Sequence, residues 1–189
     1  MIEVRPGGRR RIDRVLSPDY VQGLGSLDLT EVRARRDDAA QEETDLSYLR
    51  RILHGRIDIV IAEQQRRVEG GSQAVVERLA AILADKVVGP ATGSGRHQVM
   101  EPSRAEAHRR HVEALVSDAD LSDVANLPDD RLDLALRTYQ AEEESVSQRR
   151  REVQQVMDLL NAQIGDRYRA GSASVDDLLA AERGKRDPA

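Results

Sequence analysis

Two stretches of this chain, EETDLSYLRRILHGRID at residues 42–58 and EEESVSQRRREVQQVMD at residues 142–158, carry one polar pattern at one spacing. The pattern is E-x3-S-x2-R-x3-[QH]-x3-D. An α-helix advances about 100° per residue, so the five motif positions fall within an arc of about 80° over roughly four turns. We therefore predict that each stretch is a helix with a continuous polar stripe along one side.

The two stripes match position by position. The first stripe consists of Glu43, Ser47, Arg50, His54 and Asp58, and the second stripe consists of Glu143, Ser147, Arg150, Gln154 and Asp158. The likeness between the copies extends to Glu42 and Glu142, and to Arg51 and Arg151. This pattern indicates duplication of one helical unit, and two matched stripes suggest a symmetric polar ligand held between two helices.

Apolar residues accompany the stripes with the alternating three- and four-residue steps of a coiled coil. The predicted seam is Glu43, Leu46, Arg50, Leu53, Ile57 and Val60 in the first helix, and Glu143, Val146, Arg150, Val153, Met157 and Leu160 in the second. An acid and a base at seam positions cost stability unless something pairs with them. We predict an all-α fold, an antiparallel helical hairpin or coiled coil of two long helices with shorter accessory helices.

Glycine and proline mark the ends of the predicted elements. The long helices are predicted from about residue 31 to 69, before Gly70-Gly71, and from Pro128 to about residue 169, before Ala170-Gly171. Shorter helices are predicted at 73–88, 103–116 and 174–182. Residues 1–30 are predicted to be a flexible basic N-terminal arm, 31–183 a helical coiled-coil domain, and 184–189 a loose tail.

Composition excludes several classes of protein. The 189 residues include no Cys, which rules out disulfides, zinc thiolate sites and a cysteine nucleophile. The sequence has no apolar run long enough to cross a bilayer, and its start lacks the apolar core of a signal peptide, so we expect a cytoplasmic protein without a membrane partner. The net charge of −5 argues against direct DNA binding.

No catalytic or metal site is predicted. Glu106, His108 and His111 share a candidate helix, but the zincin pattern and a further ligand are missing. The segment GSGRH at 93–97 lacks the spacing of a phosphate-binding loop. We expect a protein that is not an enzyme and needs no metal.

The side chains of the stripes suit guanine and phosphate together. Arginine offers a planar fork of donors to phosphate or to the O6 and N7 edge of guanine, and carboxylates accept from the guanine N–H groups. Serine and glutamine add short hydrogen bonds. A ligand with two guanines, two phosphates and twofold symmetry fits this set of groups, and cyclic di-GMP has those properties.

The repeated motif resembles the signature of the RsiG family of actinobacterial anti-sigma factors, and the resemblance covers both long helices. It implies that an intercalated dimer of cyclic di-GMP binds on an antiparallel coiled coil and enables capture of the sporulation sigma factor WhiG. The capture would repress late sporulation transcription. All ten stripe residues are then ligand-binding by position, and His54 departs from the family pattern, which has Gln there.

Two other functions remain open. A structural coiled-coil adaptor without a nucleotide would explain the helices and the charge, but not the matched polar stripes. A DNA-associated protein would use the arginines at 9–11 and Arg14 in the basic arm. The candidate residues for contact with a sigma factor are the exposed apolar residues of 73–88 and 175–179.

Overall fold

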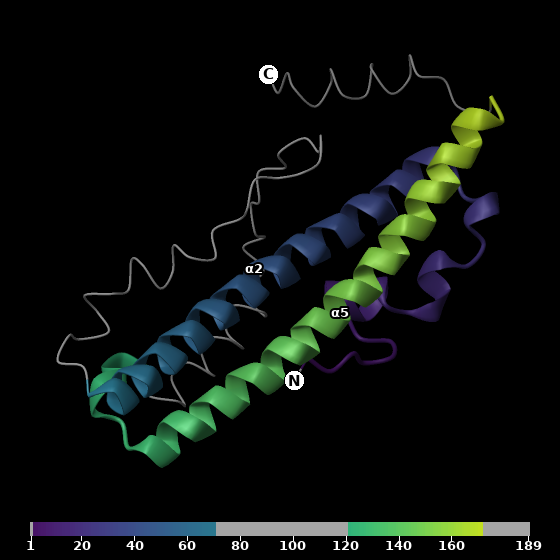
Figure 1. Ribbon diagram of the computed structural model, residues 1–189. Coiled ribbons are helices and arrows are strands. Elements are labelled where there is room, and N and C mark those ends of the chain that lie inside the picture. Colours follow the sequence, from purple (N-terminus) through teal and green to yellow (C-terminus); the bar gives the residue numbers. More distant parts are fainter. Residues whose placement is uncertain (1, 71–120, 172–189) are drawn as a thin grey trace, which may run out of the picture. The chain divides into compact units, whose positions relative to one another are not determined.

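The computed structural model describes residues 2–70 and 121–171, and all regular structure in this part of the chain is helical. Two helices of 41 residues dominate, α2 at Leu29–Glu69 and α5 at Asp129–Arg169 (Figure 1). The short elements are α1 at Arg11–Val15, η1 at Pro18–Val21, η2 at Leu24–Ser26 and η3 at Leu121–Asn126. The all-α prediction is confirmed, and both long helices lie where the sequence placed them.

The ends of the long helices follow local chemistry. Asp28 caps the start of α2, because its carboxylate accepts a hydrogen bond of 2.7 Å from the backbone N–H of Glu31. The backbone of Gly70 has a φ of 65°, a left-handed conformation that commonly ends a helix and that glycine adopts without strain. Gly171 repeats this conformation after α5 with a φ of 69°.

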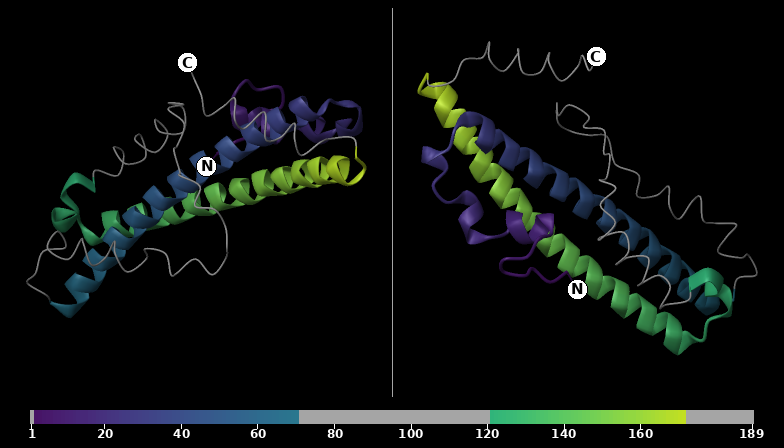
Figure 2. Two further views of the ribbon diagram at one scale, coloured as in Figure 1. Left: turned by 90° about the horizontal axis from the view of Figure 1, so that it is seen from above. Right: turned by 180° about the vertical axis from the view of Figure 1, so that it is seen from behind.

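The chain divides into two compact units, and each contains a stretch of both long helices. The first unit is Met1–Glu3 with Thr44–Arg150, and the second is Val4–Glu43 with Arg151–Ala189. In the first unit Arg50 contacts Glu143, and further along α2 Gln64 contacts Asp133. The residue number in α2 increases from one contact to the next while the residue number in α5 decreases, so the two stretches run antiparallel, as predicted. Figure 2 gives two further views of the helices.

Apolar side chains fill the first unit between the helices. Its buried residues are Ile2, Leu46, Leu49, Leu53, Ile57, Val60, Leu132, Ala135, Tyr139 and Val146. Burial of a leucine or valine side chain stabilises a fold by about 1.5–3 kcal/mol, so this seam is the main source of stability in the unit. The backbone N–H of Ile2 also donates to Ser145 at 3.1 Å, which attaches the start of the chain to α5.

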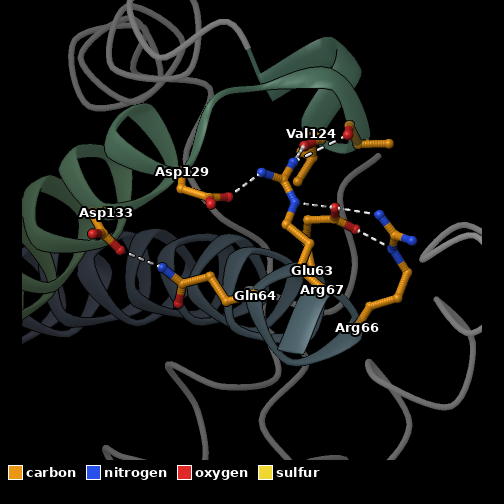
Figure 3. Close-up of polar contacts among 8 residues, drawn as sticks. Glu63, Gln64, Arg66, Arg67, Val124, Asp129 and Asp133 are labelled. Atoms are coloured by element: carbon orange, nitrogen blue, oxygen red, sulfur yellow. Dashed lines mark hydrogen bonds and ion pairs between the residues drawn. The ribbon is translucent and has the colours of Figure 1, made fainter. Parts of the chain in front are cut away.

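A buried carboxylate near the end of α2 accepts hydrogen bonds from two arginines in the first unit. Glu63 is fully buried and accepts hydrogen bonds from Arg66 and Arg67 (Figure 3). Arg67 also bonds the carboxylate of Asp129 and, at 3.3 and 3.1 Å, the backbone carbonyls of Val124 and Ala125. This arginine therefore joins the last turns of α2 to η3 and to the first turn of α5.

The second unit has its own core and its own cross-helix contacts. Its buried apolar residues are Ile12, Val15, Val32, Ala39, Val153 and Leu160. Arg33 hydrogen-bonds the hydroxyl of Tyr168, and Gln154 bonds Glu43, so these stretches of α2 and α5 also run antiparallel. Arg167 donates at 2.7 Å to the carbonyls of Leu24 and Leu27, which fixes η2 against α5.

The N-terminal segment, predicted as a flexible arm, is built into the second unit. The carboxylate of Asp13 is almost fully buried and accepts hydrogen bonds from the backbone N–H of Arg5 at 2.9 Å and from the guanidinium of Arg10. A Cβ at Gly8 would lie 2.3 Å from this carboxylate, so glycine is needed there. Ile12 and Val15 of α1 are also buried. This packing of the segment could not be predicted from its basic composition.

The structure confirms four of the six predicted seam positions in α2 and moves the other two by one residue. At the predicted position 50 the seam instead contains Leu49, only 2 % exposed, and at position 43 it contains Glu42, which is 1 % exposed. The Arg50 side chain is 40 % exposed and lies at the edge of the seam. The prediction that Glu43 and Arg50 occupy the seam is therefore wrong, because the residue before each of them is buried instead, and in α5 Glu142 is likewise buried in place of Glu143.

Several predictions lie outside the described residues: the helices at 73–88, 103–116 and 174–182, the tail at 184–189, the phosphate-loop-like segment at 93–97, the candidate sigma contacts, and Glu106, His108 and His111. Within 2–70 and 121–171, no helix combines the length and the apolar character that spanning a bilayer requires.

Candidate functional site

Four of the predicted site residues meet around one carboxylate oxygen in the first unit. Oε1 of Glu143 accepts hydrogen bonds from the Nε of Arg50 at 2.9 Å and from the hydroxyl of Ser147 at 2.7 Å. The Nε2 of His54 lies 3.1 Å from the same oxygen. Arg50 also contacts the Ser147 hydroxyl at 3.0 Å. The two copies of the motif therefore contact each other through their side chains.

The electrostatics keep Glu143 ionised. Partial burial acts to raise the pKa of its carboxyl, but the hydrogen bonds from Ser147 and Arg50 outweigh burial and leave the pKa below its ordinary value. An ionised carboxylate only accepts hydrogen bonds, so the proton in the contact with His54 is on Nε2 of the imidazole.

This arrangement leaves hydrogen-bonding groups available at the edge of the seam. Arg50 is held by its Nε, and its two Nη groups make no hydrogen bond with any residue that the structure describes. The Oε2 of Glu143 likewise has no hydrogen-bond partner within the described part of the chain. The site therefore offers a fixed guanidinium fork and a carboxylate oxygen, on side chains that are 40 % and 19 % exposed.

The second unit contains the counterpart of the histidine contact. The side-chain amide of Gln154 donates to Oε1 of Glu43 at 3.1 Å. In motif terms, the first position of one copy again contacts the fourth position of the other copy. The duplication seen in the sequence therefore extends to a specific side-chain contact, once in each unit.

The remaining stripe residues are placed as follows. Ser47, Asp58 and Arg150 are half-buried, and each makes further polar or electrostatic interactions. Asp158 is exposed and makes no hydrogen bond with a described residue. Among the described residues, no group of three or more His, Asp or Glu side chains is arranged to hold a metal ion.

Sequence reasoning missed the role of the residue that precedes each stripe. Glu42 is 1 % exposed and Glu142 is 4 % exposed, so each lies in the seam rather than in the solvent. Arg11 of α1 approaches the Glu42 carboxylate to 3.9 Å. The signal in the sequence is that both copies have glutamate at this position.

A comparison with models of known protein families gave one match. A family model described as RsiG-like matches residues 18–83 and 118–182, which include both stripes. A comparison with curated proteins gave no match.

Proposed function

The chain belongs to the RsiG-like family, and we propose that it is an anti-sigma factor that binds cyclic di-GMP and then sequesters a WhiG-type sigma factor. Family membership supports the anti-sigma role. The main observation in support of the ligand is the guanidinium of Arg50, which is anchored through Nε and whose two Nη groups bond no described residue.

The available groups suit the two chemical parts of cyclic di-GMP. The Nη fork of Arg50 can donate two parallel hydrogen bonds to a phosphate or to the O6 and N7 atoms of guanine. The Oε2 of Glu143 can accept from the guanine N1–H and exocyclic amino groups. Because Arg50 is already held at its Nε, little conformational freedom is lost when a ligand binds, which favours affinity.

The duplication supports a ligand with twofold symmetry. Glu43 with Gln154 and Glu143 with His54 present equivalent motif positions, one pair in each unit. A dimer of cyclic di-GMP has matching halves, and we propose that each half uses the residues of both stripes. The motif thus acts as a binding surface, and no step of catalysis is proposed for it.

Regulation follows from linkage. Cyclic di-GMP promotes capture of the sigma factor only if it binds the complex more tightly than it binds the free protein. We propose that the loaded protein holds a WhiG-type sigma factor in the cytoplasm and thereby represses late sporulation genes. The ligand concentration then sets the fraction of sigma factor that is free.

Calorimetric titration of cyclic di-GMP tests the ligand directly. We expect saturable binding to the wild-type chain, or to its mixture with a WhiG-type sigma factor, and loss of that binding in Arg50→Ala and Arg150→Ala. Arg137→Ala is the matched control, because Arg137 is exposed on α5 and belongs to neither stripe. No binding heat with folded protein and active sigma factor would leave a structural coiled-coil adaptor as the better account.

A further inference from the structure

We propose that Arg51 and Arg151 are additional ligand-binding residues, which contact the phosphates of the nucleotide from the outer edge of each stripe. This inference rests on the proposed function, and it adds two residues that the five-position motif does not contain.

The first observation is the pattern of identity between the two copies. Over residues 42–58 and 142–158 the copies share an identical residue at only six positions. Four of these belong to the motif, and the fifth is the buried acid at 42 and 142. The sixth is the arginine at 51 and 151. The copies differ at their remaining exposed positions, so a shared arginine on the surface requires a reason other than packing.

The second observation is the environment of these arginines. Arg51 and Arg151 are both exposed, and neither makes a hydrogen bond or ion pair with another described residue. Arg50, by contrast, is fixed by Glu143 and Ser147. An exposed arginine whose five N–H donors are not taken up by any described residue can offer them to an incoming anion.

The third observation is position on the helix. Arg51 lies one turn after Ser47 and two turns before Asp58, so it borders the stripe. The advance of about 100° per residue places it roughly 20° beyond Asp58, on the side away from the buried seam. Arg151 has the same relation to Ser147 and Asp158. A long side chain at this edge can reach over a ligand that lies along the stripe.

Charge explains why such residues are needed. The first stripe has two carboxylates and one guanidinium, and the second has the same composition, so each stripe carries a charge of −1 when His54 is neutral. A cyclic dinucleotide with two phosphates is itself a dianion. Two negatively charged stripes would repel it, whereas Arg51 and Arg151 each offset the net negative charge of the stripe that they border and offer charge-assisted hydrogen bonds to phosphate.

The test is calorimetric titration of cyclic di-GMP into the full chain, in the setting where the wild type binds. The double variant Arg51→Ala/Arg151→Ala is expected to bind about tenfold or more weakly, the loss typical of one or two charge-assisted hydrogen bonds. Arg51→Lys/Arg151→Lys keeps the charge but not the fork, and should fall between this variant and the wild type. The matched control is Arg131→Ala/Arg137→Ala, which removes the same charge from exposed sites on α5.

The outcomes separate this inference from the function on which it rests. Weaker binding in the alanine pair, with control binding unchanged and helical circular dichroism preserved, supports the inference. If wild type, alanine pair and control bind alike, Arg51 and Arg151 have no role while the proposed function stands. Equal losses in the alanine pair and the control would show a general charge effect and overturn the inference. If the wild type binds no nucleotide with or without sigma factor, both fail.

Discussion

The Nε2 of His54 lies 3.1 Å from Oε1 of Glu143, which is the same motif pairing that joins Gln154 to Glu43 at 3.1 Å. Histidine stands where the second stripe has glutamine, yet it donates to an equivalent carboxylate oxygen. The imidazole Nε2–H and the amide Nε2–H therefore serve one structural purpose. This equivalence explains how the first stripe tolerates the change.

Replacement of His54 tests this equivalence. His54→Gln restores the residue of the second stripe, so we expect cyclic di-GMP affinity within about threefold of wild type. His54→Ala removes the donor to Glu143 and should weaken binding by about tenfold, provided that this contact positions the site. Calorimetry on both variants gives the comparison. If His54→Gln binds as weakly as His54→Ala, the imidazole has a role that an amide does not fill.

Neighbouring residues on α2 should differ sharply in their effect on stability. Leu49 is 2 % exposed in the seam, so Leu49→Ala should lower the free energy of unfolding by about 2–5 kcal/mol. Arg50 is at the seam edge with its side chain 40 % exposed, so Arg50→Ala should cost about 1 kcal/mol or less. Urea unfolding followed by circular dichroism measures both. Similar losses in the two variants would favour the seam predicted from sequence over the one described here.

The junction of α2 with η3 and α5 should depend on Arg67 more than on Arg66. Arg67 bonds Glu63, Asp129 and two backbone carbonyls, so Arg67→Ala should reduce stability by about 2–4 kcal/mol. Arg66→Ala removes two hydrogen bonds to Glu63 within the same helix but leaves the contacts of Arg67 with Glu63, η3 and α5 in place, so a smaller loss is expected. Thermal unfolding of the two variants ranks them. A larger loss from Arg66→Ala would contradict this account of the junction.

Asp13 should make stability depend on pH at the acid end. Hydrogen bonds from Arg10 and from the Arg5 backbone outweigh burial and lower the pKa of the Asp13 carboxyl from 3.8 to about 2. A lowered folded-state pKa stabilises the fold above the unfolded value, and this contribution disappears as the pH falls toward the folded value. The shift corresponds to on the order of 2 kcal/mol.

The measurement compares urea unfolding of wild type and Asp13→Asn between pH 7 and pH 2. We expect wild type to be the more stable protein at pH 7 and the difference to shrink between about pH 4 and pH 2. A difference that stays constant across this range would show that the charge of Asp13 does not stabilise the segment.

The sequence predicted most of the fold because its signals are local and repeated. Each long helix can be recognised from its own sequence, by the spacing of its apolar residues and by the residues at its ends. The ends are marked by Pro128 and by the glycines at 70 and 171, and the structure has both helices at the predicted places. Which residues of each helix lie in the buried seam was harder to predict. Positions 42 and 43 are both Glu, so periodicity alone did not show which of them is buried.

The stripe residues were identifiable from the duplication, but their contacts were not. The sequence does not show that Arg50, Ser147 and His54 all contact one oxygen of Glu143, because these contacts depend on the register of α2 against α5. The contacts that residues 2–28 make with the long helices and with each other were also not predicted. They depend on the burial of Asp13 beneath Gly8, a tertiary contact that basic composition does not reveal.

The measurement that tests the central claim most directly is complex formation between this protein and a WhiG-type sigma factor, followed by sedimentation velocity with and without cyclic di-GMP. The account predicts that the nucleotide produces or strongly tightens the complex, and that Arg50→Ala/Arg150→Ala removes this dependence while the variant remains helical. A complex of equal affinity with and without nucleotide, or none in either condition, would contradict it.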